Sequence, residues 1–250
     1  MRVLSQPAFL LHTRPFRETS LITELFTREY GRIGLLARGV RNPKSRKRAL
    51  VMPFQPLLVG WSGKGELPLL TGIEATGEAR ELMPEQRYAA FYMNELLLKL
   101  LHRHDAHEQL FDFYGGVLND IYQGVAIENA LRRFEKQLLS QTGYGLILEH
   151  EAGSSHPVVA ERIYRYIPEL GPRPLMNNES GRIDREQGIN IKGKSLLDFS
   201  REIFDDRESL NECRKLVRYL LDRQLSGKPL HSRQVFHQVL FTLAQNDFVA

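Results

Sequence analysis

A run of positive charge is the strongest indication of ligand binding in this chain. Between Tyr30 and Arg48 there are seven basic residues and no acidic one. Cations of one sign neutralise the phosphates of a nucleic acid, whereas a solvated loop, the alternative interpretation, usually mixes signs. The run therefore predicts a groove for phosphates, which basic residues further upstream would extend. The predicted site comprises Arg14, Arg17, Arg32, Arg38, Arg41, Lys44, Arg46, Lys47 and Arg48.

A second motif could bind the phosphates of a nucleotide. Gly188–Ser195 has the glycine, lysine and serine spacing of a phosphate-binding loop. Such a loop follows a buried strand and precedes a helix, and its main-chain amides hold the phosphates. The residues before Gly188 are too polar for a buried strand, and Ile189–Ile191 itself has the pattern of a strand. We therefore favour a plain turn before a helix, with an NTPase as the alternative.

The other potentially reactive side chains do not indicate a catalytic site or a metal site. His102, His104 and His107 form a cluster in the sequence, and His104 and His107 could share a helical face and bind a metal ion. No further ligands converge on them, so solvated histidines are favoured. The single cysteine, Cys213, excludes an internal disulfide and a four-cysteine zinc site. It is spaced with Leu210 and Val217 on an apolar face, which predicts a buried thiol. We expect no metal, no cofactor and no enzymatic activity.

The predicted secondary structure that positions these residues changes from strands to helices near residue 80. Before it, short apolar or alternating segments separated by turns predict about five strands, which suit a small closed barrel better than a sandwich. After Met83-Pro84 the apolar residues follow helical spacing. The sequence thus predicts an α+β protein, with a barrel over 1–80 and a mainly helical domain over 81–250. Helical faces are predicted near 84–101, 110–121, 131–139, 210–221 and 236–243, and an irregular segment at 146–192.

Charge and hydropathy agree with this division. Of the 34 basic and 30 acidic residues, residues 1–80 hold 13 and 6, which leaves 21 and 24 for residues 81–250. A basic first third suggests that this part faces a polyanion. The chain has no apolar stretch of the roughly 18 residues that a membrane helix needs, and its first residues are too polar for a signal peptide. We expect a cytoplasmic protein without a membrane partner.

Several short segments occur in a characteristic order along the chain, including Glu18–Ser20, Leu25–Thr27, Phe54–Leu57, Leu131–Glu135, Gly143–Gly145 and Gly227–Leu230. This ordered series resembles the RecO family of bacterial recombination mediators, of the type found in gammaproteobacteria. The resemblance implies an N-terminal OB-fold and a helical domain with a zinc-ribbon-like insert. Many relatives carry four zinc-binding cysteines where this chain has Leu146–Met176, which contains none, so zinc is not implied.

The resemblance also implies an activity and partners. Such proteins bind single- and double-stranded DNA, anneal complementary strands without ATP and, with RecR, help load RecA onto strands coated by SSB. They are associated with the nucleoid. An alternative from another class is a structural adaptor between SSB and RecR that does not itself contact DNA. Bases could stack on Phe16, Phe26, Tyr30 or Trp61, although core positions are equally consistent and we expect Phe26 to be buried.

The resemblance places the binding site for the C-terminal tail of SSB in the helical domain. That tail is acidic with an apolar end, so it requires an apolar pocket with cations at its rim. Arg132 matches the family segment most closely, and solvated helix faces are the alternative for the other residues. The predicted rim consists of Arg132, Arg133, Arg214, Lys215 and Arg218.

Overall fold

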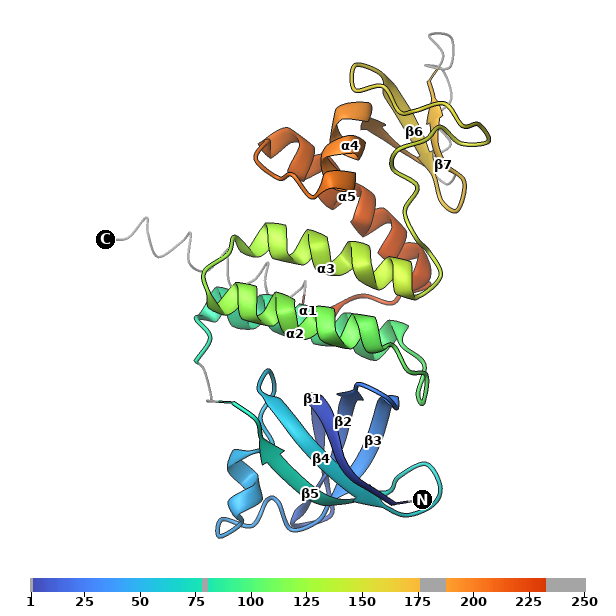
Figure 1. The fold of residues 1–250 in the computed structure, drawn as a ribbon. Helices are drawn as coiled ribbons and strands as arrows, with labels where there is room; N and C mark the ends of the chain where they lie inside the picture. Colours follow the sequence, from blue (N-terminus) through green and yellow to red (C-terminus); the bar gives the residue numbers. More distant parts are fainter. Residues whose placement is uncertain (1, 78–80, 176–187, 233–250) are drawn as a thin grey trace, which may run out of the picture. The chain divides into compact units, whose positions relative to one another are not determined.

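The computed structural model describes residues 2–77, 81–175 and 188–232, and it forms two compact units (Figure 1). One unit comprises residues 1–124 and is rejoined by the chain at Leu230, whereas the second comprises Val125–Pro229. In the described part of the chain, no helix has the length and apolar character needed to cross a membrane.

The first unit contains a closed five-stranded barrel with the strand order β1-β2-β3-β5-β4. Strand β1 pairs with both β2 and β4, which closes the barrel, and β3 meets β5 in parallel at Leu36 and Leu69. A short 3-10 helix, η1, lies between β3 and β4. This is the small closed barrel that the strand pattern predicts, and it agrees with the OB-fold that the family resemblance implies. The bounds are β1 Arg2–Phe16, β2 Ser20–Thr27, β3 Gly31–Ala37, η1 Arg46–Ala49, β4 Pro56–Ser62 and β5 Leu69–Ala75.

Side chains alternate along the strands, so one set forms the apolar interior of the barrel and the other set lies on its outer face. Part of that outer face is covered by a helix. Leu10, Leu25 and Leu35 are among the buried residues of the interior. On the outside, Phe9 and Phe26 pack against Phe111 of the helix α2, with ring centroids 5.2 and 5.4 Å apart. The helices of this unit are α1, Pro84–Leu100, and α2, Glu108–Tyr122. They follow the predicted helical spacing, and Pro84 occupies the first turn of α1, where its missing N–H costs nothing.

The packing of α1 and α2 explains where the compact units divide. Phe9 and Phe26 of the barrel strands contact Phe111 of α2, and the amide of Asn94 on α1 donates to main-chain carbonyls of β1. Both helices therefore fall in the same unit as the barrel. The predicted boundary at residue 80 marks the change from strands to helices, whereas the compact units divide after Gly124.

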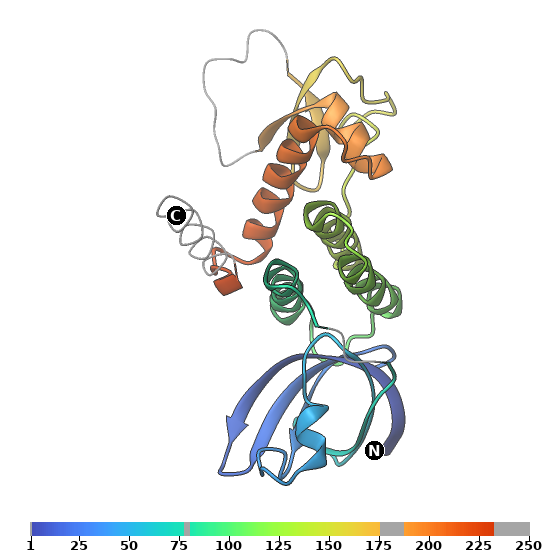
Figure 2. The same cartoon turned by 90° about the vertical axis from the view of Figure 1, so that its left-hand side faces the viewer.

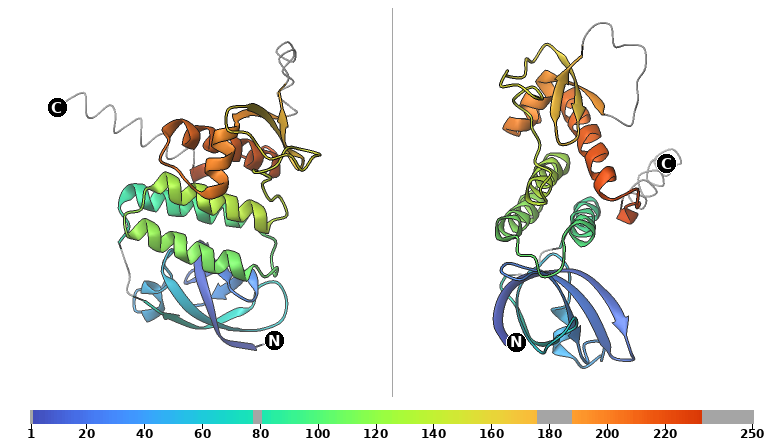
Figure 3. Two further views of the ribbon diagram at one scale, coloured as in Figure 1. Left: turned by 45° about the horizontal axis from the view of Figure 1, so that its top comes forward. Right: turned by 90° about the vertical axis from the view of Figure 1, so that its right-hand side faces the viewer.

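The second unit combines helices with a small antiparallel sheet of order β7-β6-β8. Helix α5 packs against α3 and α4, and both α4 and α5 contact β8 (Figure 2, Figure 3). The segment predicted to be irregular contains these three strands, and its zinc-ribbon-like shape stays a prediction. The predicted helix at 236–243 lies outside the described residues. The bounds are α3 Ile127–Gln141, β6 Ile163–Ile167, β7 Gly171–Pro174, β8 Ile189–Lys192, α4 Gly193–Arg201 and α5 Arg207–Gln224.

Candidate nucleic-acid interface

Four of the predicted phosphate-binding arginines gather at one end of the barrel. Arg14 lies near the end of β1 and Arg17 in the turn to β2, while Arg38 and Arg41 follow the end of β3. Strand pairing brings these three segments together, because the last residue of β1 pairs with the first of β2, and β2 then pairs with the end of β3. All four side chains are exposed, and none forms an ion pair with a described residue. We call these four residues the basic end.

Arg41 holds the turn that carries Arg17. Its main-chain N–H donates to the carbonyl of Thr19 at 2.9 Å, and its guanidinium donates to the carbonyl of Arg17 at 3.2 Å. Arg17 has a φ of 52°, in the left-handed region, which costs a non-glycine residue on the order of 1 kcal/mol. The two bonds from Arg41 offset this cost and fix the turn. In that conformation the guanidinium of Arg17 lies 5.3 Å from the ring centroid of Phe16.

The basic loop, which we define as Lys44–Arg48, is more ordered than a solvated linker. Its last residues form the helix η1, and the following Leu50 and Val51 pack against the barrel interior. The ammonium of Lys47 donates to the carbonyl of Thr71 on β5 at 3.3 Å. The loop joins two strands, as predicted, but it carries its charges on a short anchored helix. Lys44, Arg46 and Arg48 are exposed.

Arg32 lies away from the basic end. It is at the start of β3, six residues before Arg38, which corresponds to about 20 Å along an extended strand. Its guanidinium is half-buried and donates to the carbonyl of Leu98 in α1 at 2.6 Å. Burial lowers the pKa of Arg32, and the carboxylate of Glu24 opposes this change. Arg32 therefore joins α1 to the barrel, a role that its place in the basic run does not indicate.

Three of the four aromatic residues considered for base stacking are buried or packed against another aromatic ring of the first unit. Phe26 is completely buried, as expected, although it lies on the outer face of the barrel against α2. Trp61 is buried in the barrel interior, and the ring of Tyr30 packs edge-on against it at 5.1 Å. Phe16 differs from these three, because it is half-buried and adjoins the basic end.

Arg132 does not face solvent as a rim residue would. Its side chain is only 9% exposed and lies 2.8 Å from the carboxylate of Glu135, which is 1% exposed. This position corrects the expectation of an accessible cation at Arg132, because the residue lies on the buried side of α3. Its charge also acts on the buried thiol of Cys213 in α5.

The other predicted rim residues have varied surroundings. The guanidinium of Arg133 lies 3.4 Å from Glu202, and that of Arg214 lies 3.3 Å from Glu128 on α3. Arg218 is 3.7 Å from Asp222, one turn further along α5. The three α5 residues of the predicted rim are all exposed. Whether they bind an acidic tail stays a prediction.

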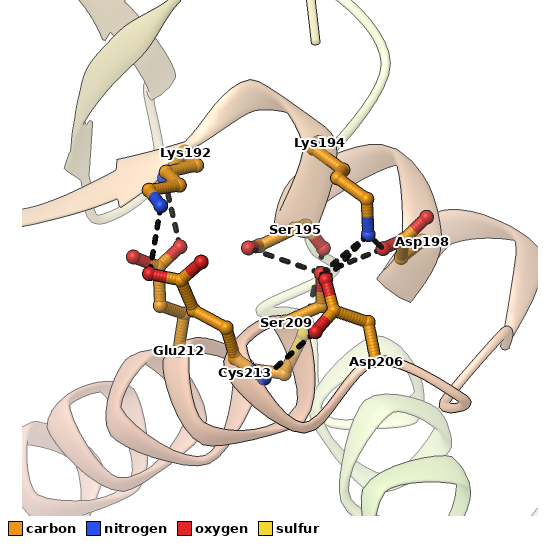
Figure 4. Close-up of polar contacts among 9 residues, drawn as sticks. Lys192, Lys194, Ser195, Asp198, Asp206, Ser209, Glu212 and Cys213 are labelled. Atoms are coloured by element: carbon orange, nitrogen blue, oxygen red, sulfur yellow. Dashed lines mark hydrogen bonds and ion pairs between the residues drawn. The ribbon is translucent and has the colours of Figure 1, made fainter. Parts of the chain in front are cut away.

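The residues of the phosphate-loop motif form a strand and a helix start (Figure 4). Ile189–Lys192 is β8, at the edge of its sheet, so these residues do not form a loop around a phosphate. The ammonium of Lys194 lies 2.7 Å from Asp198 and 2.6 Å from Asp206. Hydrogen bonds to these carboxylates raise the pKa of Lys194. Its charge is neutralised within the unit, and a lysine held protonated cannot act as a general base.

Packing explains why the motif residues occur in this order. A Cβ atom on Gly193 would lie 2.0 Å from the carbonyl oxygen of Val159, so only glycine fits there. Ser195 is buried, and its carbonyl accepts a hydrogen bond from the thiol of Cys213 at 3.4 Å. Cys213 is completely buried, which confirms the predicted buried thiol, and burial raises its pKa to about 12. No group of three or more potential metal ligands occurs among the described residues.

Comparisons with known proteins cover nearly the whole chain. Residues 1–78 match the family model described as "Recombination protein O N terminal", and residues 84–234 match "Recombination protein O C terminal". A protein from Nitrosococcus oceani named "DNA repair protein RecO" is 43% identical over 239 residues, which are 96% of this chain and 95% of that protein. A protein of the same name from Dechloromonas aromatica is 43% identical over 243 residues, 95% of this chain and 97% of that protein.

Proposed function

The chain belongs to the RecO family of DNA repair proteins, and from this premise we propose that it is a recombination mediator that works without ATP. It binds single- and double-stranded DNA and anneals complementary strands. With RecR, it helps load RecA onto strands coated by SSB. The observation that carries the proposal is the basic end, four exposed arginines without ion-pair partners among the described residues, on an OB-fold barrel.

Annealing needs charge rather than bond chemistry. Two strands repel each other through their phosphates, and a cluster of arginine and lysine reduces that repulsion when both strands lie against it. The basic loop adds cations to the first unit, and the exposed Arg46 and Arg48 are available to phosphates. Because phosphates carry these contacts, binding is largely independent of sequence.

The surroundings of Lys194 support an ATP-independent mechanism. A phosphate-binding lysine must leave its charge for the nucleotide, but Lys194 is neutralised by Asp198 and Asp206. The residues that would wrap the phosphates are paired in a sheet instead. The motif is explained by packing, and the NTPase alternative has no support in the geometry.

The second unit offers a pocket for the SSB tail. This pocket, about 570 Å³ in volume, lies where α3 ends and where α5 ends. Its lining combines apolar side chains with Arg223 and with two carboxylates, those of Glu169 and Asp222. The apolar side chains suit the apolar end of the tail, whereas its acidic part requires cations outside the pocket. Exposed cations earlier on α5, including Lys215, would attract the carboxylates of the tail. The lining includes Tyr144, Leu146, Tyr166, Pro168, Leu220 and Arg223.

Titration of the purified protein with a labelled single strand, without ATP and at two salt concentrations, tests this proposal against its alternatives. We expect tight binding that weakens with salt, together with annealing of complementary strands in the same buffer. Binding or annealing that requires ATP would favour an NTPase. An SSB tail that binds while the oligonucleotide does not would favour the structural adaptor.

A further inference from the structure

We infer that Phe16 stacks an unpaired base, and that in the free protein Arg17 occupies the ring face on which the base will lie. This inference rests on the proposed binding of single-stranded DNA and names the residue that recognises the strand. Cations alone attract single strands and duplexes alike. An aromatic ring at the same place adds a contact that only a strand with unstacked bases can make.

The register of the sheet points Phe16 outward at the basic end. Leu21, which pairs with Pro15, packs against the barrel interior. Because side chains alternate along a strand, Arg14 and Phe16 on either side of Pro15 face outward together. Phe16 pairs with Ser20, which is buried, whereas the ring itself is half-buried. The ring is therefore next to a cation that precedes it on the same face and a cation that follows it in the turn.

The contact between Arg17 and Phe16 resembles the contact that a base would make. A guanidinium is planar, and it stacks on an aromatic face much as a base does. Here it lies 5.3 Å from the ring centroid, and it is exposed and without an ion-pair partner among the described residues. A base that replaces it on the ring frees Arg17 for the phosphate of the same nucleotide. The exchange loses one exposed cation–π contact and gains one stacking contact and one phosphate contact.

Arg41 fixes the turn that follows the ring. Its bonds to the carbonyls of Thr19 and Arg17 hold the left-handed conformation at Arg17. This conformation sets the direction in which the chain leaves the ring. Arg41 is therefore a positioning residue, and its guanidinium is partly used in the turn rather than offered entirely to DNA.

The first experiment combines a change in the protein with a change in the ligand. Phe16→Leu keeps an apolar side chain but removes the ring, and a strand with abasic sites keeps the phosphates but lacks the bases. We expect Phe16→Leu to weaken binding of the normal strand at least about fivefold, with an unchanged salt slope. It should leave binding of a duplex and of the abasic strand nearly unchanged. An equal loss on the normal and the abasic strand would overturn the inference.

The matched control is Arg17→Gln, which removes a charge one residue away. It should reduce the salt slope by about 0.7 on single strands, whether or not the bases are present. The two variants are therefore distinguished by the ligand feature to which each responds. Their melting temperatures are compared with that of the parent, because Phe16 is half-buried.

The second experiment observes the ring directly. The chain has a single tryptophan, Trp61, and it is buried. Phe16→Trp therefore adds a second, partly exposed indole whose fluorescence a stacked base quenches. We expect quenching by the normal strand and little by the abasic strand or the duplex. If the variant binds DNA as tightly as the parent without quenching, the stacking residue is not Phe16. If the parent itself fails to bind DNA, the proposed function fails instead.

Discussion

The hydroxyl of Tyr114 on α2 donates to the side-chain carbonyl of Asn94 on α1 across 2.5 Å, and both residues are buried. The amide of Asn94 in turn donates to the main-chain carbonyls of Leu10 and Leu11, at 3.4 and 3.1 Å. These carbonyls lie where the pairing of β1 with β2 shifts register, a place where a strand leaves backbone groups unpaired. One side-chain pair thus provides hydrogen-bond donors for the main-chain carbonyls at the register shift of β1, and it joins both helices to the barrel.

Tyr114→Phe should lower the free energy of unfolding by about 1–3 kcal/mol, because the carbonyl of Asn94 is left buried without its donor. Asn94→Ala should cost more, since it removes three hydrogen bonds, two to main-chain carbonyls and one from the Tyr114 hydroxyl. Urea denaturation measures both. Tyr144→Phe, at a site 47% exposed, is the matched control and should change little. Full stability of Tyr114→Phe would mean that the pair does not hold the helices to the barrel.

Replacing Arg46, Lys47 and Arg48 by Ala should weaken single-strand binding on every sequence tested. The slope of log K against log salt should shrink by roughly 2, at about 0.7 for each phosphate contact. A matched variant, Arg214, Lys215 and Arg218 to Ala, removes the same charge from α5. If both triple variants reduce the slope equally, the effect comes from net charge, and the basic loop has no specific role.

The α5 triple variant should bind a labelled SSB tail peptide at least about tenfold more weakly. Loss of even one charge-assisted contact is sufficient for a change of that size. The basic-loop triple variant should bind the peptide normally, so the two variants give opposite results on peptide and DNA. Arg223→Glu, at the pocket lining, tests whether the apolar end of the tail lies there. Peptide binding that survives both α5 changes would place the tail site elsewhere.

Arg132→Glu should unfold the second unit rather than merely weaken a surface contact. The change would place a carboxylate beside the buried Glu135, and breaking a buried ion pair costs about 3–5 kcal/mol. Arg132→Met combined with Glu135→Leu removes both charges and should recover most of the stability. Thermal melting of the single and double variants distinguishes the two cases. A folded Arg132→Glu protein that has lost only tail binding would restore Arg132 to the rim.

Lys194→Ala should leave annealing unchanged, lower the stability of the second unit near neutral pH, and make its loss of stability in acid shallower. Its ion pair, with further hydrogen bonds, lowers the pKa of Asp206 from 3.8 to about 2. A carboxylate with a lowered pKa stabilises the fold above its unfolded pKa, and this stabilisation is lost as pH falls from about 4 to about 2.

Melting temperature against pH measures this effect. Asp206→Asn should show a shallower fall in that range than the parent, because asparagine still caps α5 but does not titrate. Asp205→Asn is the neighbouring control, and its profile should follow the parent. Identical profiles for all three proteins, or ATP turnover that Lys194→Ala abolishes, would contradict this account of the motif.

The sequence alone determined the features that depend on local pattern. The change from alternating to helical spacing after Met83 predicts the barrel and then the helices, because each periodicity buries one face of its element. The position of Cys213 beside apolar residues predicts its burial in the same way. The polar residues before Gly188 and the alternation within Ile189–Ile191 indicate that the motif is not a phosphate loop. Helix α4 was less predictable, since it has only nine residues.

Tertiary structure decided which cations are available to a ligand. Arg32 and Arg38 belong to one basic run, but Arg32 is bound by Leu98, 66 residues away, while Arg38 remains exposed at the other end of the strand. Arg132 and Arg133 are adjacent, but only Arg132 is buried with Glu135. The charge of a side chain is a property of its type. Its partners come from segments that only folding brings together, so charge patterns locate a basic region but do not identify which cations in it are free.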